Sequence, residues 1–211
     1  MNVNIWGPPF WEILHGMAGL VNARNYTSFQ FIMFHLNYLL PCIHCRNSYN
    51  EFYKLLDFTS QVNNKFYMLQ IYNLHNLVNK KLDDQKGRTN INPSFEVISN
   101  RFYLSMGLPF CDEQLWKVIY VLSLNNKKET QVYYVDFLRN MGLFFASTDY
   151  YREESALLLS LSSKIAKLDY IVPEKLFELI DLERYGKYDP QIFRAYSQIV
   201  PAKSCSTNTC K

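Results

Sequence analysis

Apolar side chains recur at helical spacing through most of the chain. After Pro8 and Pro9, for example, Trp11, Leu14 and Ala18 fall on one face of a helix. Glycine is scarce, with 7 residues in 211. Few glycines and long helical patterns favour helices over a β-sandwich or a Rossmann sheet. The sequence therefore predicts an all-α protein.

Turn-forming and capping residues divide these patterns into separate helices. Pro8 and Pro9 suit the first turn of a helix, where a missing N–H costs little. Thr27 or Ser28 suits the cap of the next helix, and Pro41 separates that helix from a third. We predict helices over about residues 8–18, 27–39, 42–58, 62–83, 93–103, 112–124, 131–145, 151–167, 173–184 and 190–199.

The run Met106-Gly107-Leu108-Pro109-Phe110 breaks the helical pattern near the middle of the chain. A chain of 211 residues is long enough for one substantial core or two modest ones. We therefore expect one helical domain over residues 1–108 and a second, of unknown role, over residues 109–200. Residues 201–211 are rich in Ser and Thr and should form a flexible tail.

Composition argues against several classes of protein. Hydrophobic residues make up 48%, which argues against wholesale disorder, and the net charge of +3 is too small to imply nucleic-acid binding. No signal-peptide pattern is visible, and no apolar stretch approaches the roughly 18 to 20 residues that span a bilayer. We expect a soluble protein of the cytoplasm, where cysteine pairs are more often metal-binding or catalytic than structural.

Two cysteines separated by two residues, in Cys42-Ile43-His44-Cys45, stand at the predicted start of a helix. Such a pair can close a small disulfide ring, and the N–H groups of a helix N-terminus favour a thiolate. Taken alone, the pair is equally compatible with half of a zinc site, a redox pair or chance. Another cysteine, Cys111, has no neighbour in sequence, and we expect it to be buried and inert.

A histidine and two asparagines border an apolar stripe in the predicted fourth helix. His75 and Asn79 are one turn apart and share a face, with Asn76 beside them. If buried, these polar groups need partners, because each unsatisfied group costs about 1–3 kcal/mol. The residues suit either a solvated polar flank or a site for a polar cofactor between helices.

Three sequence blocks together resemble the Erv/ALR family of FAD-linked sulfhydryl oxidases. They are Trp6-Gly7-x-x-x-Trp11-x-x-Leu14-His15-x-x-Ala18, Pro41-Cys42-x-x-Cys45 and His75-Asn76-x-Val78-Asn79-x-x-Leu82. The resemblance covers residues 6–82, and the family domain would extend to about residue 105, so the second half lies outside it. Two positions depart from the family pattern. Tyr72 replaces a cysteine of a structural disulfide, which must be absent here, and Asp83 replaces a glycine.

The resemblance implies a four-helix bundle with a short fifth helix that holds FAD beside the two thiols. Cys45 would lie next to the flavin, whereas Cys42 would be the more exposed sulfur that exchanges with incoming thiols. Lys81 would contact the phosphates of the cofactor. The full set of positions implied for the FAD site is Gly7, Trp11, His15, Cys45, His75, Asn76, Val78, Asn79, Lys81 and Leu82.

The tail pair Cys205 and Cys210 acquires a role from the same resemblance. Family enzymes often carry a second, shuttle disulfide on a flexible terminal segment. Electrons would pass from thiol-containing protein substrates through Cys205/Cys210 and Cys42/Cys45 to FAD, and then to dioxygen, giving hydrogen peroxide. The competing hypothesis is a zinc-binding or partner-binding helical interaction protein, against which no second CxxC or HxxxH pair appears at the usual spacing.

The resemblance also carries expectations about assembly and location. Family members are commonly homodimers, and we expect a homodimer here. Large DNA viruses that assemble in the host cytoplasm encode compact members of the family, and the missing targeting signal and the appended second half fit such an origin. We therefore expect the protein in the host cytoplasm, at assembly sites or in virions, with no membrane span, no nucleic-acid partner and no bound metal.

Overall fold

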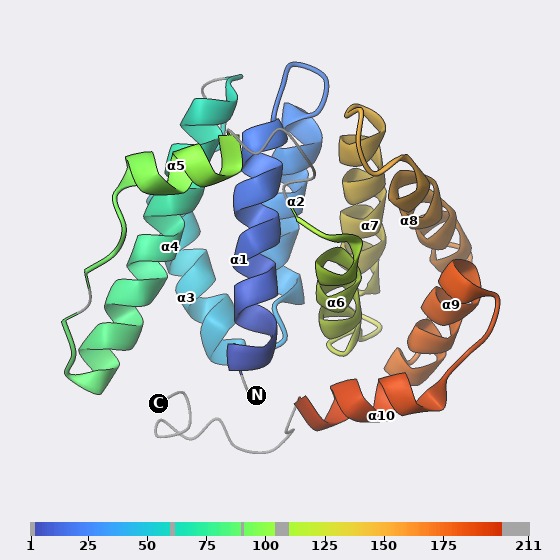
Figure 1. Ribbon diagram of the computed structural model, residues 1–211. Coiled ribbons are helices and arrows are strands. Elements are labelled where there is room, and N and C mark those ends of the chain that lie inside the picture. The colour runs from blue at the N-terminus through green and yellow to red at the C-terminus, as the bar shows by residue number, and fades with distance from the viewer. Residues whose placement is uncertain (1–2, 60–61, 90, 104–109, 200–211) are drawn as a thin grey trace.

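The computed structural model describes residues 3–59, 62–89, 91–103 and 110–199, which form ten α-helices and no strand (Figure 1). The all-α prediction is confirmed. Within these residues no helix is long and apolar enough to cross a membrane. The helices are α1 (Val3–Leu20), α2 (Tyr26–Leu39), α3 (Ile43–Tyr53), α4 (Asn64–Lys86), α5 (Phe95–Tyr103), α6 (Asp112–Ser123), α7 (Gln131–Ala146), α8 (Arg152–Ile165), α9 (Pro173–Tyr185) and α10 (Pro190–Ile199).

The first four helices lie side by side, and α5 crosses over α1 and α4 (Figure 1). Helix α4 packs against α1 on one side and α3 on the other, and α3 also packs against α2. The short fifth helix contacts both α1 and α4. These contacts are compatible with a four-helix bundle. That the bundle has the helix arrangement of the Erv/ALR family stays a prediction.

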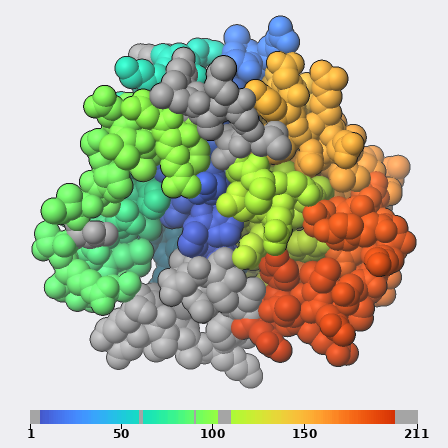
Figure 2. Space-filling model, viewed as in Figure 1, coloured from blue at the N-terminus to red at the C-terminus, as the bar shows by residue number. Residues whose placement is uncertain are grey.

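The second five helices pack directly onto the first. Helix α1 meets α6 and α2 meets α7, while α7 and α8 form the most extensive helix pair. In the space-filling view a strip of α1 is visible between α4 and α5 on one side and α6 on the other (Figure 2). One continuous cluster of buried apolar side chains runs from Trp6 to Ile180. The predicted boundary at residue 108 lies outside the described residues, so the division into two domains stays a prediction.

Helix α1 begins earlier than predicted, so Pro8 and Pro9 lie inside the helix rather than in its first turn. The prediction of that start was wrong because the extra turn is held by packing. Trp6 is only 5% exposed, and its ring meets that of Phe10 edge-on with centroids 5.7 Å apart. Pro8 and Pro9 lie beyond the first turn, so they remove the N–H donors that would otherwise bond to the carbonyls of residues 4 and 5.

Helix α3 ends at Tyr53, about one turn before the predicted end. Beyond it the chain turns so that Phe58, 2% exposed, enters the core and its ring stacks on Tyr53 at 5.4 Å. The carbonyl oxygen of Phe58 accepts hydrogen bonds from Gln30 Nε2 and from the Tyr67 hydroxyl, at 2.5 and 3.0 Å. This long-range burial stops the helix, and no local sequence signal marks it.

Candidate functional site

The two thiols flank the first turn of α3, as predicted. Cys42 is the N-cap residue, with extended backbone angles (φ −93°, ψ 123°). Its Sγ accepts a hydrogen bond from the backbone N–H of Cys45, at 3.3 Å. The Cys42 sulfur therefore lies at the positive end of the helix dipole, where a thiolate is stabilised.

The relative exposure of the two cysteines is the reverse of the prediction. Cys42 is 4% exposed, whereas Cys45 is half-buried and packs against the hydrophobic core. The expectation that Cys42 is the more exposed sulfur was wrong, because the capping role turns its side chain back onto the helix. Cys45 is thus the more accessible member of the pair in this structure.

The first and third sequence blocks meet in a cluster of aromatic rings between α1 and α4. The rings of Trp11 and His75 stack, with centroids 4.0 Å apart and planes inclined by 7°. His15 Nε2 lies 3.1 Å from His75 Nδ1, at hydrogen-bonding distance. Phe102 of α5 stacks on His15, with centroids 5.2 Å apart. Residues 60 positions apart in the chain therefore lie in contact with one another.

Both histidines of this cluster are neutral at pH 7. Burial lowers the pKa of His15 to about 3, with smaller contributions from His75 and Arg101, and burial lowers the pKa of His75 to about 4. In their hydrogen bond one imidazole donates and the other accepts. Within the described residues, the buried His15 Nδ1 and Trp6 Nε1 have no hydrogen-bond partner. Such orphaned polar atoms point to a missing partner.

A second contact joins the third block to the helix that carries the thiols. Lys81 Nζ of α4 donates to Ser48 Oγ of α3, and Ser48 in turn donates to the carbonyl of His44, at 2.8 Å. Asn79 Nδ2 donates to Asn92 Oδ1, at 2.8 Å, and so joins α4 to the segment before α5. The ammonium group of Lys81 therefore lies against α3 one turn beyond the dithiol.

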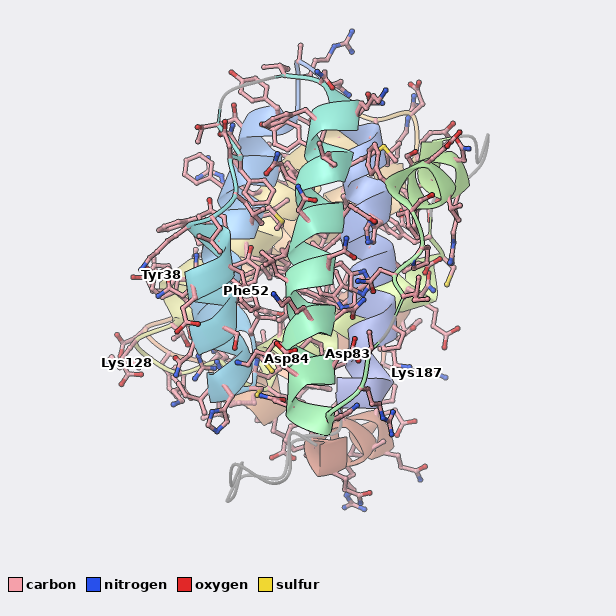
Figure 3. All side chains as sticks on the ribbon, turned by 90° about the vertical axis from the view of Figure 1, so that its left-hand side faces the viewer. Tyr38, Phe52, Asp83, Asp84, Lys128 and Lys187 are labelled. Atoms are coloured by element: carbon pink, nitrogen blue, oxygen red, sulfur yellow. The ribbon has the colours of Figure 1, made fainter. Side chains whose placement is uncertain are left out.

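The buried side chains of α4 lie in the first half of the helix, and farther along its side chains are at most half-buried. Its fully buried residues end at Leu74, and Asn76, Val78 and Leu82 are only half-buried. Viewed along this side, α4 lies between α3 and α1, with Asp83 and Asp84 toward its C-terminal end (Figure 3). The stretch that carries the third block is thus the part of the helix that the protein leaves incompletely covered. The remaining implied position, Gly7, is buried in α1.

Tyr72 stands where family members have a disulfide cysteine, and here it ties α4 to the segment before α5 by weaker contacts. Its hydroxyl donates to the carbonyl of Pro93, at 2.9 Å, and its ring meets Phe95 with centroids 5.5 Å apart. Arg101 of α5 adds an ion pair to Glu12 of α1, at 2.5 Å. Noncovalent contacts therefore hold α5 over α1 and α4.

Of the three other cysteines, Cys111 is the one that lies within the described residues. Cys205 and Cys210 lie outside the described residues. Cys111 is exposed, so the expectation that it is buried was wrong. It is the N-cap residue of α6, and its backbone N–H bonds to Gln114 Oε1, at 3.0 Å, which places its side chain at the surface end of the helix.

Sequence reasoning did not find three residues that contribute to the site. Ser48 and Phe102 belong to no motif, and only their contacts with Lys81 and His15 mark them. Arg46 follows the second thiol directly, and that adjacency was the available signal.

Comparison of the chain with protein-family models, with curated proteins and with solved structures found no match. No group of three or more His, Cys, Asp or Glu side chains arranged to hold a metal ion occurs in the described parts of the chain. The residues of the site and their geometry are therefore the basis for the function proposed below.

Proposed function

We propose that this protein is an FAD-dependent thiol oxidase that forms disulfides in protein substrates. The observation that carries the proposal is the convergence of three separate sequence blocks. His75 contacts Trp11 and His15 of α1, and Lys81 reaches Ser48 on the helix that begins with the two thiols. Helix α4 thus links the helix that carries Trp11 and His15 to the helix that begins with the two thiols.

The side chains of this region are of the chemical types that can bind FAD. Trp11 and His75 offer flat aromatic faces, the neutral imidazoles and the orphaned His15 Nδ1 offer polar partners, and Lys81 offers a positive charge for phosphates. Because the rings of Trp11 and His75 touch, a flat group can enter between them only if one side chain turns aside. When bound, FAD supplies the two-electron chemistry that carries electrons from a dithiol to dioxygen.

The residues of the chain itself perform the thiol exchange. A substrate thiolate attacks one sulfur of the Cys42–Cys45 disulfide, and that S–S bond breaks as a mixed disulfide forms. A second substrate thiolate then displaces the mixed disulfide. The substrate leaves oxidised, and Cys42 and Cys45 are left reduced by two electrons. The hydrogen bond from the Cys45 N–H stabilises negative charge on the Cys42 sulfur during the exchange.

The test is thiol-dependent oxygen consumption by the full-length, flavin-loaded protein. With reduced dithiothreitol we expect oxygen uptake and an equal amount of hydrogen peroxide. Replacement of both Cys205 and Cys210 by Ser should slow the oxidation of a protein dithiol more than that of dithiothreitol, if the tail pair is a shuttle. No thiol-dependent oxygen uptake by the flavin-loaded chain would contradict the proposal. Stoichiometric zinc in a folded, flavin-free preparation would favour the competing hypothesis instead.

A further inference from the structure

We infer that Arg46 makes the Cys42–Cys45 pair a stronger oxidant, by clamping the turn that carries the thiols and by holding a positive charge beside them. Arg46 does not touch the reacting partner in this account; it acts through the two cysteines. It is therefore a positioning residue. The inference rests on the proposed thiol-oxidase function for its consequence in turnover, but the thiol chemistry itself is measurable without flavin.

Arg46 spans the turn from both ends. Its backbone N–H donates to the carbonyl of Cys42, at 2.9 Å, and its guanidinium Nη1 donates to the carbonyl of Leu40, at 2.5 Å. Leu40 precedes the first thiol by two residues, and Arg46 follows the second thiol directly. The backbone bond is the first i→i−4 bond of the helix, and the side-chain bond ties the helix to the segment that precedes the dithiol. The guanidinium is confined next to the segment in which both sulfurs lie.

The charge of Arg46 is felt by both thiols. Arg46 is half-buried, and burial lowers the pKa of its guanidinium, whereas the negative character of Cys42 and Cys45 raises it. An attraction of this kind is mutual, so the same guanidinium favours thiolate at each cysteine. A second cation, Lys81 of α4, lies against Ser48 one turn further along α3, and His44 is exposed. Arg46 is the cation that is tied to the turn itself.

A stabilised thiolate changes the redox equilibrium of the pair. The charge acts on the reduced form, because the disulfide carries no thiolate to stabilise. Favouring the reduced form makes the disulfide a stronger oxidant, the behaviour known for dithiols with depressed thiol pKa values. In exchange with glutathione disulfide, a cysteine thiolate forms a mixed disulfide and releases glutathione. The second cysteine then displaces the other glutathione and closes the Cys42–Cys45 bond.

The decisive variant is Arg46→Gln, which removes the charge and keeps an amide donor. The matched control is Arg24→Gln, which makes the same change of net charge at an exposed position in the turn between α1 and α2. We expect Arg46→Gln to raise the pKa of the more acidic thiol by about one unit, measured by thiolate absorbance. The equilibrium with glutathione should shift about tenfold toward the disulfide, or about 30 mV toward a more reducing couple. Arg24→Gln should match the unaltered protein.

Two further measurements guard against a variant that fails to fold. Arg46→Met keeps the apolar stem of the side chain and should reproduce the shift of Arg46→Gln. In the unaltered protein, added salt screens the attraction, so the pKa of the more acidic thiol should rise with ionic strength. Identical thiol pKa values and exchange equilibria in Arg46→Gln and Arg24→Gln would overturn the inference, as would a thiol pKa independent of salt. A protein that shows the Arg46 effect but consumes no oxygen would disprove the oxidase proposal alone.

Discussion

Helix α4, the fourth of the first five helices, and helix α9, the fourth of the last five, differ in how far their apolar side chains are covered by the rest of the protein. Helix α9 buries Leu176, Phe177 and Ile180 completely, each at 0% exposed. Exposed apolar side chains of α9 occur only in its last turn, where Leu182 is 45% exposed. In α4, by contrast, no side chain of residues 75–86 is buried, and Val78 and Leu82 there are half-buried. A half-covered apolar stripe beside polar side chains is typical of a helix that contributes to a binding site.

Helices α3 and α8, the third helix of each set of five, also differ in how closely they are packed. Helix α8 packs so closely on α7 that a Cβ on Gly142 would lie 2.7 Å from Leu159 Cγ. Helix α3 buries only Ser48 and Tyr49, and at its start Cys42 is buried as the N-cap residue while Cys45 is half-buried. Helix α8 is therefore packed more closely against its neighbours than α3.

Buried polar atoms without a partner among the described residues occur in both halves, for example His15 Nδ1 in the first and Asn126 Oδ1 in the second. In the second set, the fully buried Asp181 accepts hydrogen bonds from the Tyr120 hydroxyl and, at 3.3 Å, from the Asp189 N–H. The two halves differ in how completely the apolar side chains of α4 and α9 are covered, and we propose that the less covered part of α4 borders the flavin site.

The largest effect expected from this contrast is on turnover. Replacing Cys45 by Ser removes one sulfur of the reactive pair, so thiol-dependent oxygen uptake should fall by at least about 100-fold, or about 2.7 kcal/mol in activation free energy. Bound flavin should be retained. Cys111→Ser, in the second half, is the control and should keep full activity. Undiminished thiol-dependent oxygen uptake by the Cys45→Ser protein would show that Cys42 and Cys45 are not the reactive pair.

A matched pair of leucines tests the difference in packing. Leu176→Ala in α9 leaves a cavity in the core and should lower the free energy of unfolding by about 2–5 kcal/mol. Leu82→Ala in α4 should cost only about 1 kcal/mol, because the side chain is already half-exposed, but it should weaken flavin retention. Urea denaturation measures the first quantity and flavin absorbance the second. Equal losses of stability would show that α4 is as tightly packed as α9.

The pH dependence of stability should arise in the first half, which contains all four histidines. The folded-state pKa values of His15 and His75, about 3 and about 4, lie below the unfolded value of about 6.5. Protonation therefore favours the unfolded chain, and stability falls as pH drops from about 6.5 toward 4. Each histidine contributes at most about 1.4 kcal/mol per pH unit. Denaturation at pH 7 and pH 5 should show this loss, and His75→Gln should reduce it; an unchanged slope would contradict the assignment.

The smallest effect concerns the contact of Tyr72 with the segment before α5. Tyr72→Phe removes the hydrogen bond to Pro93 and keeps the ring against Phe95, so the cost should be about 0.5–1.5 kcal/mol. Hydrogen exchange should quicken in residues 91–103 and not in α9. Uniformly faster exchange in both halves would indicate a global rather than a local effect.

Local signals predicted much of the fold. The starts of α9 and α10 follow from Pro173 and Pro190, and the end of α9 coincides with Gly186, whose φ of 68° suits glycine. The start of α1 and the end of α3 were missed because they depend on burying Trp6 and Phe58 against distant helices. No local pattern encodes such packing.

The candidate site, like the fold, could be predicted only in part from the sequence. The members His15, His75 and the two thiols could be named from spacing and resemblance. The stack of Phe102 on His15, and the inward turn of the Cys42 side chain, could not be foreseen. They depend on how helices separated by tens of residues pack together, which residue types alone do not specify.

The most direct test of the central claim is the flavin content of the purified full-length protein. The proposed function predicts one FAD per chain, measured by absorbance after release, with the cofactor held by the first five helices. His75→Ala, which removes the ring stacked on Trp11, should lose most of the FAD, while His35→Ala, between α2 and α7, should keep it. Folded protein that binds no FAD, or that binds it equally well in both variants, would contradict the account.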